Sequence, residues 1–155
     1  MKKSLKKKET NLTRMQEIIS DKNWEKLGTH PIIDEHDIVK VRSVVRQHAK
    51  NFKMGIVEQT RITTAVSELF RNMYNYANGG EVIIEKGLVE GHDALIITCI
   101  DEGPGIEDVE MAMSDGYTSG MGMGYGLPGA KRLVDNFEIY SVPKKGTKVR
   151  VMKWK

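Results

Sequence analysis

The sequence predicts an α/β (α+β) fold, a two-layer sandwich with helices on one face of a mixed, mostly antiparallel sheet. Three features indicate it: a long amphipathic helical segment at about 57–77, two strand-like runs at 81–89 and 94–101, and two closing runs at 137–142 and 147–154. In the last run apolar and polar residues alternate, which is typical of a strand with one wet face. A chain of 155 residues with 39% hydrophobic residues can bury one core.

The segment at 57–77 shows the clearest periodicity. One stripe with a period of 3.6 residues faces the predicted core and consists of Ile62, Val66, Leu69, Met73 and Tyr76. A second row lies roughly 100° around the helix and consists of Arg61, Glu68, Asn72 and Asn75. Because that second row borders the core, we expect a cleft along it.

The remaining elements follow from shorter patterns. We expect a short strand at 32–33, a helix capped by Asp37 that runs to about Phe52, and helices at about 106–113 and 127–136. Gly79-Gly80 ends the long helix. The run at 94–101 is apolar on both faces, which predicts a central strand. A loose helical pattern at 12–27, with Trp24, fits a partner-binding helix or a flanking segment without a role.

Charge is distributed unevenly along the chain. Five of its 24 lysines and arginines lie in the first eight residues, so the rest carries 19 basic against 21 acidic residues. A nucleic-acid-binding domain needs a basic face on its folded part, so we expect no nucleic-acid partner. We divide the chain into a basic tail and flanking segment, 1–30, expected to be solvated and mobile, and one folded domain, 31–155.

The sequence also indicates the compartment. A single cysteine, Cys99, suits a reducing environment, and its apolar neighbours predict that it is buried. No apolar run approaches the roughly 20 residues of a membrane span, and no secretory signal is apparent. We expect a cytoplasmic protein without a membrane partner. The four histidines lack metal-ligand spacing, which disfavours a zinc site.

A glycine-dense loop precedes the predicted helix at 127–136. Six glycines fall within fourteen residues, at Gly116, Gly120, Gly122, Gly124, Gly126 and Gly129. Glycines let backbone amides turn toward a ligand, and the following helix start at Leu127 adds unpaired N–H groups, so the loop suits a triphosphate. Residues 124–129 also match a dinucleotide-binding pattern, but no strand comes just before them, which disfavours that interpretation.

Other chemistry-bearing residues are weaker signals taken singly. Asp101 ends the central strand, where its carboxylate can accept a hydrogen bond from an exocyclic amine, while Gly103 and Gly105 let a flat ring approach; an ordinary turn would also explain this motif. Asn72 offers an oxygen for Mg²⁺, and Glu68, one turn away, can accept a proton, although such a pair is commonly a solvated helix face. Thr147 follows Gly146 and is expected to point toward the helices.

The order of these motifs carries a resemblance. Glu68-x-x-x-Asn72, Asp101-x-Gly-x-Gly105, the glycine-rich segment 120–126 and Gly146-Thr147 resemble the nucleotide-binding boxes of GHKL (Bergerat or HATPase fold) ATPases. The stretches RITTAVSELFRNMYNYA (61–77), GYGLPGAKRLVD (124–135) and VMKW (151–154) are similar to the RsbT-type serine/threonine switch kinases of bacterial stress signalling. The resemblance covers about residues 31–155, so that range is identified as a GHKL ATP-binding kinase domain.

The resemblance implies ATP and Mg²⁺ as cofactors and a role for each matched residue. Asp101 would bind the adenine amino group, with Gly105 and Thr147 lining the base pocket, and Gly103 and Leu127 would also belong to the nucleotide site. Asn72 would hold Mg²⁺, and the amides of Gly120, Gly122, Gly124 and Gly126 would close over the phosphates. Glu68 would be the general base for a substrate serine or threonine.

The partners, too, are implied by the resemblance alone. They are STAS-domain scaffold or antagonist proteins as substrates, assembled in a stressosome, and a downstream output regulator that the released kinase activates. The main alternative is an anti-sigma factor kinase that binds and sequesters a sigma factor. A histidine kinase would need a helical hairpin with a phospho-acceptor histidine, and a mechanochemical ATPase of this type would need a transducer domain after the ATP domain; we expect neither.

Overall fold

One five-stranded sheet with the strand order β1-β2-β3-β5-β4 forms the centre of the protein. The computed structural model describes residues 23–114 and 126–155. Its strands are β1 (Glu25–Ile32), β2 (Gly80–Val89), β3 (His92–Asp101), β4 (Asn136–Val142) and β5 (Gly146–Trp154). Each of the four strand pairings is antiparallel. The central position predicted for the run 94–101 is confirmed, because β3 lies in the middle of the sheet.

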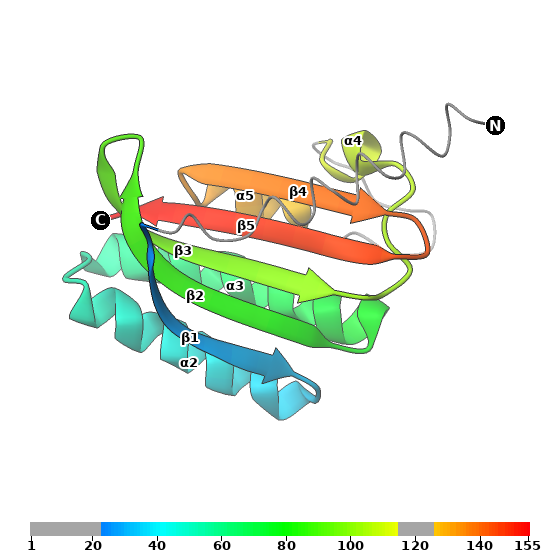
Figure 1. Cartoon of the computed structure of the whole chain (residues 1–155), viewed down its shortest axis with the longest axis horizontal. Helices are drawn as coiled ribbons and strands as arrows, with labels where there is room; N and C mark the ends of the chain where they lie inside the picture. The colour runs from blue at the N-terminus through cyan, green and yellow to red at the C-terminus, as the bar shows by residue number, and fades with distance from the viewer. Residues whose placement is uncertain (1–22, 115–125) are drawn as a thin grey trace.

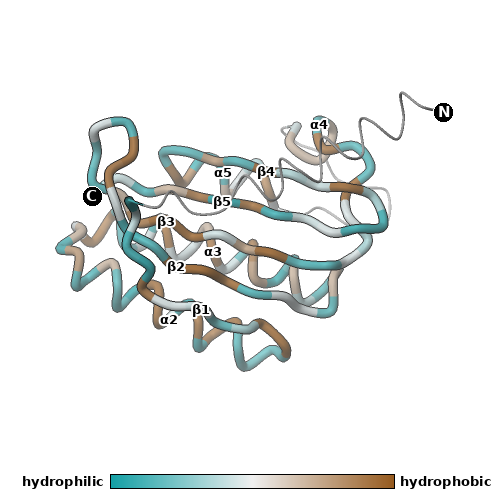
Figure 2. The backbone as a smooth tube through the Cα atoms, viewed as in Figure 1, coloured by the Kyte–Doolittle hydropathy of each residue, from teal (hydrophilic) through white to brown (hydrophobic). Residues whose placement is uncertain are grey.

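The helices form a second layer on one face of this sheet, as Figure 1 shows for α2 (Glu35–Asn51), α3 (Ile56–Ala77) and α5 (Leu127–Arg132). The short helix α4 (Val109–Ala112) is drawn above the edge strand β4, near its arrowhead, in Figure 1. Figure 2 shows hydrophobic segments along β2 and β3 and at intervals along α2 and α3. The α+β two-layer fold class predicted from the sequence is therefore confirmed.

Helix α2 begins with a capping box. Asp34 is the N-cap, its Oδ1 accepting a hydrogen bond from the Asp37 amide at 3.1 Å, and the Asp37 carboxylate accepts from the Asp34 amide at 3.2 Å. The predicted cap at Asp37 is thus wrong by three residues, because Asp37 occupies the reciprocal N3 position. The buried stripe consists of Ile38, Val41, Val45 and Ala49.

Helix α3 buries the predicted stripe, with Ile62, Val66, Leu69 and Met73 in the core, while Tyr76 is half-buried. The helix ends at Ala77, and Asn78 adopts the left-handed conformation with φ of 57°, one residue before the predicted Gly79 stop. A C-terminal residue of this conformation lets its amide bond back to the last turn, and here the amide of Asn78 donates to the Met73 carbonyl.

The boundaries predicted near the start of the sheet also differ from the structure. Strand β1 spans Glu25–Ile32, so the helical pattern proposed up to Leu27 is wrong for residues 25–27 and the strand is longer than 32–33. Its pairing with β2 explains the difference, since that edge supplies a full set of hydrogen-bond partners. The remainder of the 12–27 pattern, and the basic tail, lie mostly outside the described residues.

Helices α4 and α5 are also shorter than the predicted 106–113 and 127–136. Helix α5 stops early because the chain joins the sheet at Asp135. The amide of Asp135 donates to the Met152 carbonyl at 3.0 Å, and its carboxylate accepts from Lys153 Nζ at 2.6 Å and from the Trp154 amide at 2.7 Å.

The outer face of β5 is not the wet face that the alternation predicts. Lys148 and Arg150 are only 5% and 4% exposed, and Met152 packs in a second cluster with Ala94 and Ile96. The Trp24 ring covers the Arg150 guanidinium at 5.0 Å, and Arg150 Nε donates to Thr98 Oγ1 at 2.9 Å. A cation can be buried in this way when an aromatic face and a hydroxyl replace water.

In the part of the chain that the structure describes, no helix is long and apolar enough to cross a membrane.

Candidate functional site

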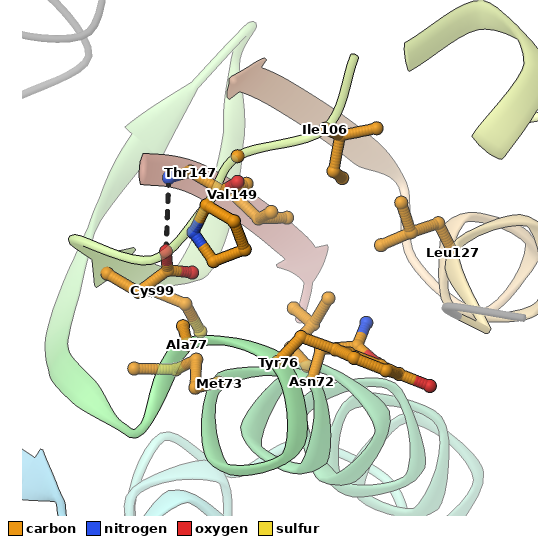
Figure 3. Close-up of a pocket in the computed structure, with 13 residues that line it drawn as sticks. Asn72, Met73, Tyr76, Ala77, Cys99, Ile106, Leu127, Thr147 and Val149 are labelled. Atoms are coloured by element: carbon orange, nitrogen blue, oxygen red, sulfur yellow. Dashed lines mark hydrogen bonds between the residues drawn. The ribbon is translucent and has the colours of Figure 1, made fainter. Parts of the chain in front are cut away.

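A cavity of about 300 Å³ opens between α3 and the ends of β3 and β5. Helix α3 forms one wall, because residues spaced by three and four positions lie on the same side of a helix. That wall consists of Leu69, Asn72, Met73, Tyr76 and Ala77. The other walls are Cys99 and Asp101 of β3, the loop residues Pro104, Gly105 and Ile106, Leu127 of α5, and Thr147 and Val149 of β5. Figure 3 shows Asn72 and Tyr76 on one side of this space and Ile106 and Leu127 on others.

Asp101 is the only carboxylate among the described residues that line the cavity. Its Oδ1 accepts hydrogen bonds from the backbone amides of Gly103, at 3.0 Å, and Thr147, at 3.2 Å (dashed in Figure 3). Within the ranges 23–114 and 126–155, Oδ2 makes no hydrogen bond. Burial raises the pKa of Asp101 above its usual 3.8, and the two amides oppose that rise. The side chain is thus held at one oxygen while the other can accept a ligand's proton donor.

Thr147 is positioned by a residue that no sequence motif indicated. Ser141 on β4 lies opposite Thr147 in the ladder, and their hydroxyl oxygens are 2.7 Å apart. Ser141 Oγ also accepts from the Ile106 amide at 2.6 Å. It therefore links β5 to the loop that carries Gly105. The only sequence signal for this is the register of two adjacent strands, which a single serine does not reveal.

Gly103 and Gly105, which were expected to let a flat ring approach, also have roles in packing. A Cβ on Gly103 would lie 2.7 Å from the Ala77 Cα, so this residue lets the loop pack on α3, and it is not among the lining residues. Gly105 has φ of 73°, and a Cβ there would overlap the Val142 carbonyl oxygen. Close packing within the protein explains both glycines, and Gly105 also lines the cavity.

Asn72 and Glu68 separate into neighbouring sites. Asn72 lines the cavity, whereas Glu68 lines a second, polar groove between α2 and α3. Glu68 Oε1 accepts from Arg71 Nη1 at 3.1 Å, and Oε2 lies 2.8 Å from where a Cβ on Gly126 would stand. With φ of 66°, Gly126 can begin α5 directly against Glu68, and Leu127 then enters the cavity. Gly120, Gly122 and Gly124 lie outside the described residues.

The cavity can hold a planar ligand that carries an amino group. Its volume is at the lower end of the roughly 300–1,000 Å³ of small-molecule sites. Buried apolar side chains such as Leu69, Met73 and Val149 can contact a ring, and Asp101 Oδ2 can accept from its amine. The thiol of Cys99, buried as expected, takes no part as a thiolate because burial raises its pKa far above the usual value.

The fold and this cavity agree with a comparison against protein families. Residues 57–155, more than half of the chain, match the model described as histidine kinase-, DNA gyrase B-, and HSP90-like ATPase. The protein therefore belongs to this ATPase family, the HATPase or GHKL family, as the resemblance implied. Membership implies that it uses ATP.

Individual relatives give a finer comparison. The chain is 46% identical over 123 residues to the serine/threonine-protein kinase RsbT of Bacillus subtilis, covering 79% of this chain and 92% of that protein. It is 37% identical over 120 residues to the anti-sigma F factor of Thermoanaerobacter sp., covering 73% and 82%. Among solved structures, the Acinetobacter baumannii histidine kinase AdeS aligns with a TM-score of 0.42 and 15% identity over 96% of this chain and 77% of that one. The family assignment rests on the family model and the two sequence relatives.

Proposed function

We propose that this protein is an ATP- and Mg²⁺-dependent serine/threonine protein kinase that phosphorylates STAS-domain partner proteins in a stressosome-type bacterial switch. The observation that carries the proposal is the 46% identity to a serine/threonine-protein kinase over most of both chains. It is supported by a cavity lined by the carboxylate of Asp101, which has one oxygen held by backbone amides.

In this proposal the cavity binds the adenine end of ATP. Asp101 Oδ2 accepts from the adenine amino group, and Gly105, Leu127 and Thr147 contribute to the walls around the base. Gly103 acts through its amide, which orients Asp101. Asn72, on the same wall of α3, supplies an oxygen for Mg²⁺, which commonly keeps few protein ligands. The glycine-rich segment 120–126 would cover the phosphates.

Glu68 is the proposed general base for transfer. Bound ATP supplies the γ-phosphoryl group: a bond forms from the substrate hydroxyl oxygen to the γ-phosphorus, the bond from that phosphorus to the β–γ bridging oxygen breaks, and ADP leaves. The hydroxyl proton passes to the Glu68 carboxylate, a contribution of typically 10²–10⁴-fold in rate. Glu68 stands one helical turn from Asn72, and its side chain is 41% exposed, so a protein substrate can reach it.

The partners belong to the same proposal. We place STAS-domain proteins as substrates and expect the released kinase to activate a downstream output regulator. A second candidate is supported by the 37% identity to anti-sigma F factors: a kinase that also sequesters a sigma factor. Affinity capture with the full chain distinguishes the two, since recovery of a sigma factor without a STAS protein supports the second.

The direct test is phosphoryl transfer. The full chain is incubated with Mg-ATP and each candidate STAS protein, and the product is mapped by mass spectrometry. One added phosphate on a serine or threonine, lost when a chelator removes Mg²⁺, is the expected result. Absence of modification on every STAS protein tested, with ATP binding intact, would contradict the proposal.

A further inference from the structure

A polar groove lies between α2 and α3, next to the cavity and separate from it. Its volume is about 360 Å³, and none of the described residues that line it is apolar. It is lined by Arg42, Ser43, Arg46, Thr63, Thr64, Ser67, Glu68 and Arg71, and we call it the arginine groove. Glu68 connects it to the proposed transfer site. A partner that reaches Glu68 therefore contacts this groove as well.

The groove contains more positive charge than its own residues neutralise. Glu68, the one carboxylate among its described lining residues, already accepts from Arg71 at 3.1 Å. Arg46 donates to the neutral hydroxyl of Thr63 at 3.2 Å. The Arg42 side chain makes no hydrogen bond or ion pair with any residue in the described ranges. Two guanidinium groups thus face the groove without an anionic partner from that part of the chain.

The buried hydroxyls in the groove do not supply donors for an anion. Thr63 Oγ1 donates to the Gln59 carbonyl at 2.8 Å, and Ser67 Oγ donates to the Thr63 carbonyl at 2.7 Å. Each hydroxyl has one hydrogen, so both are used within α3. The exposed hydroxyls of Ser43 and Thr64 can add a neutral hydrogen bond, but the charge that an anion needs comes from the arginines. Their planar, permanently charged groups match a carboxylate in a two-point fashion.

The placement of Arg42 and Arg46 on α2 favours a role in binding over that of ordinary solvated surface charges. Arg42 and Arg46 are four residues apart, so both project from the same side of α2 toward Thr63, Thr64 and Ser67 on α3. Like charges that face one small groove repel each other, and an anion between them removes that repulsion. The described lining of the groove is wholly polar, so its charge selects an acidic partner over an apolar one.

We infer that the arginine groove docks an acidic side chain of the protein substrate beside the hydroxyl that is to be phosphorylated. The inference rests on the proposed kinase function for the role of Glu68, but the docking itself is a property of Arg42 and Arg46. It names a specificity determinant: an aspartate or glutamate near the acceptor serine or threonine.

The first experiment separates docking from catalysis by steady-state kinetics with a STAS protein that the kinase phosphorylates. Arg42→Glu/Arg46→Glu should raise KM for the protein substrate about tenfold or more and leave kcat and ATP affinity near the parental values. Arg42→Lys/Arg46→Lys keeps the charges without the two-point geometry and should recover only part of that loss. Lys50→Glu reverses one charge at an exposed position of α2 outside the groove and should leave KM unchanged. Melting temperatures check that each variant folds.

The second experiment does not require kinase activity. A synthetic peptide with one serine flanked by glutamates is titrated into isotope-labelled full-length protein and followed by NMR. Amide shifts at 42–46 and 63–71 are expected, to be lost in Arg42→Glu/Arg46→Glu and retained in Lys50→Glu. Shifts that spare the groove, or a KM that the double reversal leaves within twofold, would overturn the docking inference. Groove shifts without phosphoryl transfer to any protein would instead overturn the proposed function alone.

Discussion

Replacing Asp101 with asparagine tests the proposed nucleotide site at one atom. In the parental protein Oδ1 accepts from the Gly103 and Thr147 amides, and Oδ2, which makes no hydrogen bond within 23–114 and 126–155, is left for a ligand in the cavity that Asp101 lines. Asparagine can keep its carbonyl oxygen on the two amides, and its NH₂ then meets the adenine amine, donor against donor. If the amide flips, the ligand regains an acceptor but two backbone donors lose theirs. Neither orientation satisfies all three groups.

The size of the effect follows from these bonds. A hydrogen bond to a charged group is worth about 1.5–3 kcal/mol, and leaving a buried donor unpaired costs about 1–3 kcal/mol. A combined loss of about 3–4 kcal/mol corresponds to a roughly 100- to 1,000-fold rise in the Kd for ATP, at about 1.4 kcal/mol per tenfold.

The fold should tolerate the change. Burial raises the pKa of Asp101, so the folded state holds this proton more tightly than the unfolded chain. The contribution of Asp101 to stability is then fully present below pH 3.8 and is lost as pH rises through the folded pKa. The neutral amide avoids that loss, and the variant's Tm at neutral pH should be no lower than the parental value.

Calorimetric titration of ATP, with thermal melts at acid and neutral pH, measures both quantities. Asp93→Asn is the matched control, because Asp93 lies near the other end of β3 and is exposed. A Kd for Asp101→Asn within threefold of the parental value would refute the assignment of Asp101 to adenine.

Four further changes have defined outcomes. Glu68→Ala should slow phosphoryl transfer by roughly two or more orders of magnitude while ATP still binds, and an unchanged transfer rate would remove its role as base. Asn72→Ala should abolish Mg²⁺-dependent transfer, measured by phosphate incorporation; full activity would contradict a metal role. Gly105→Ala, at φ of 73° and against the Val142 carbonyl, should lower the free energy of unfolding by about 2 kcal/mol or more, whereas Gly129→Ala, with open space, should not. Burial, together with the nearby charges of His30 and Lys86, lowers the pKa of His48. The stabilising contribution of neutral His48 is therefore present above pH 6.5 and is lost as pH falls through the folded pKa. In His48→Gln the decrease of Tm on acidification should be smaller.

Much of the fold is predictable because its patterns are local. The period of 3.6 residues in α3 and the doubly apolar run of β3 each reflect burial that one element decides for itself. The predicted boundaries were wrong where contacts with a distant segment set the end of an element. Strand β1 starts at Glu25 because β2 pairs with it, and α5 ends early because Asp135 bonds to β5.

The prediction that the outer face of β5 is exposed to solvent was wrong for a similar reason. Its alternation of Lys148, Arg150 and Met152 with apolar residues predicts solvent, but the ring of Trp24 covers Arg150 and excludes water from it. Nothing near β5 in the sequence announces a tryptophan that precedes it by more than a hundred residues.

For the candidate site, too, some features follow from the local sequence and others only from the tertiary structure. The sequence alone determined the order and identity of the motifs around Glu68, Asn72, Asp101 and Thr147, because backbone turns and ligand chemistry restrict which residue types can stand at each position. Only the tertiary structure separated Glu68 from the cavity and placed it among the arginines of α2. It alone also revealed Ser141 behind Thr147. Contacts between segments far apart in the chain depend on register and helix packing, and those are properties of the folded molecule.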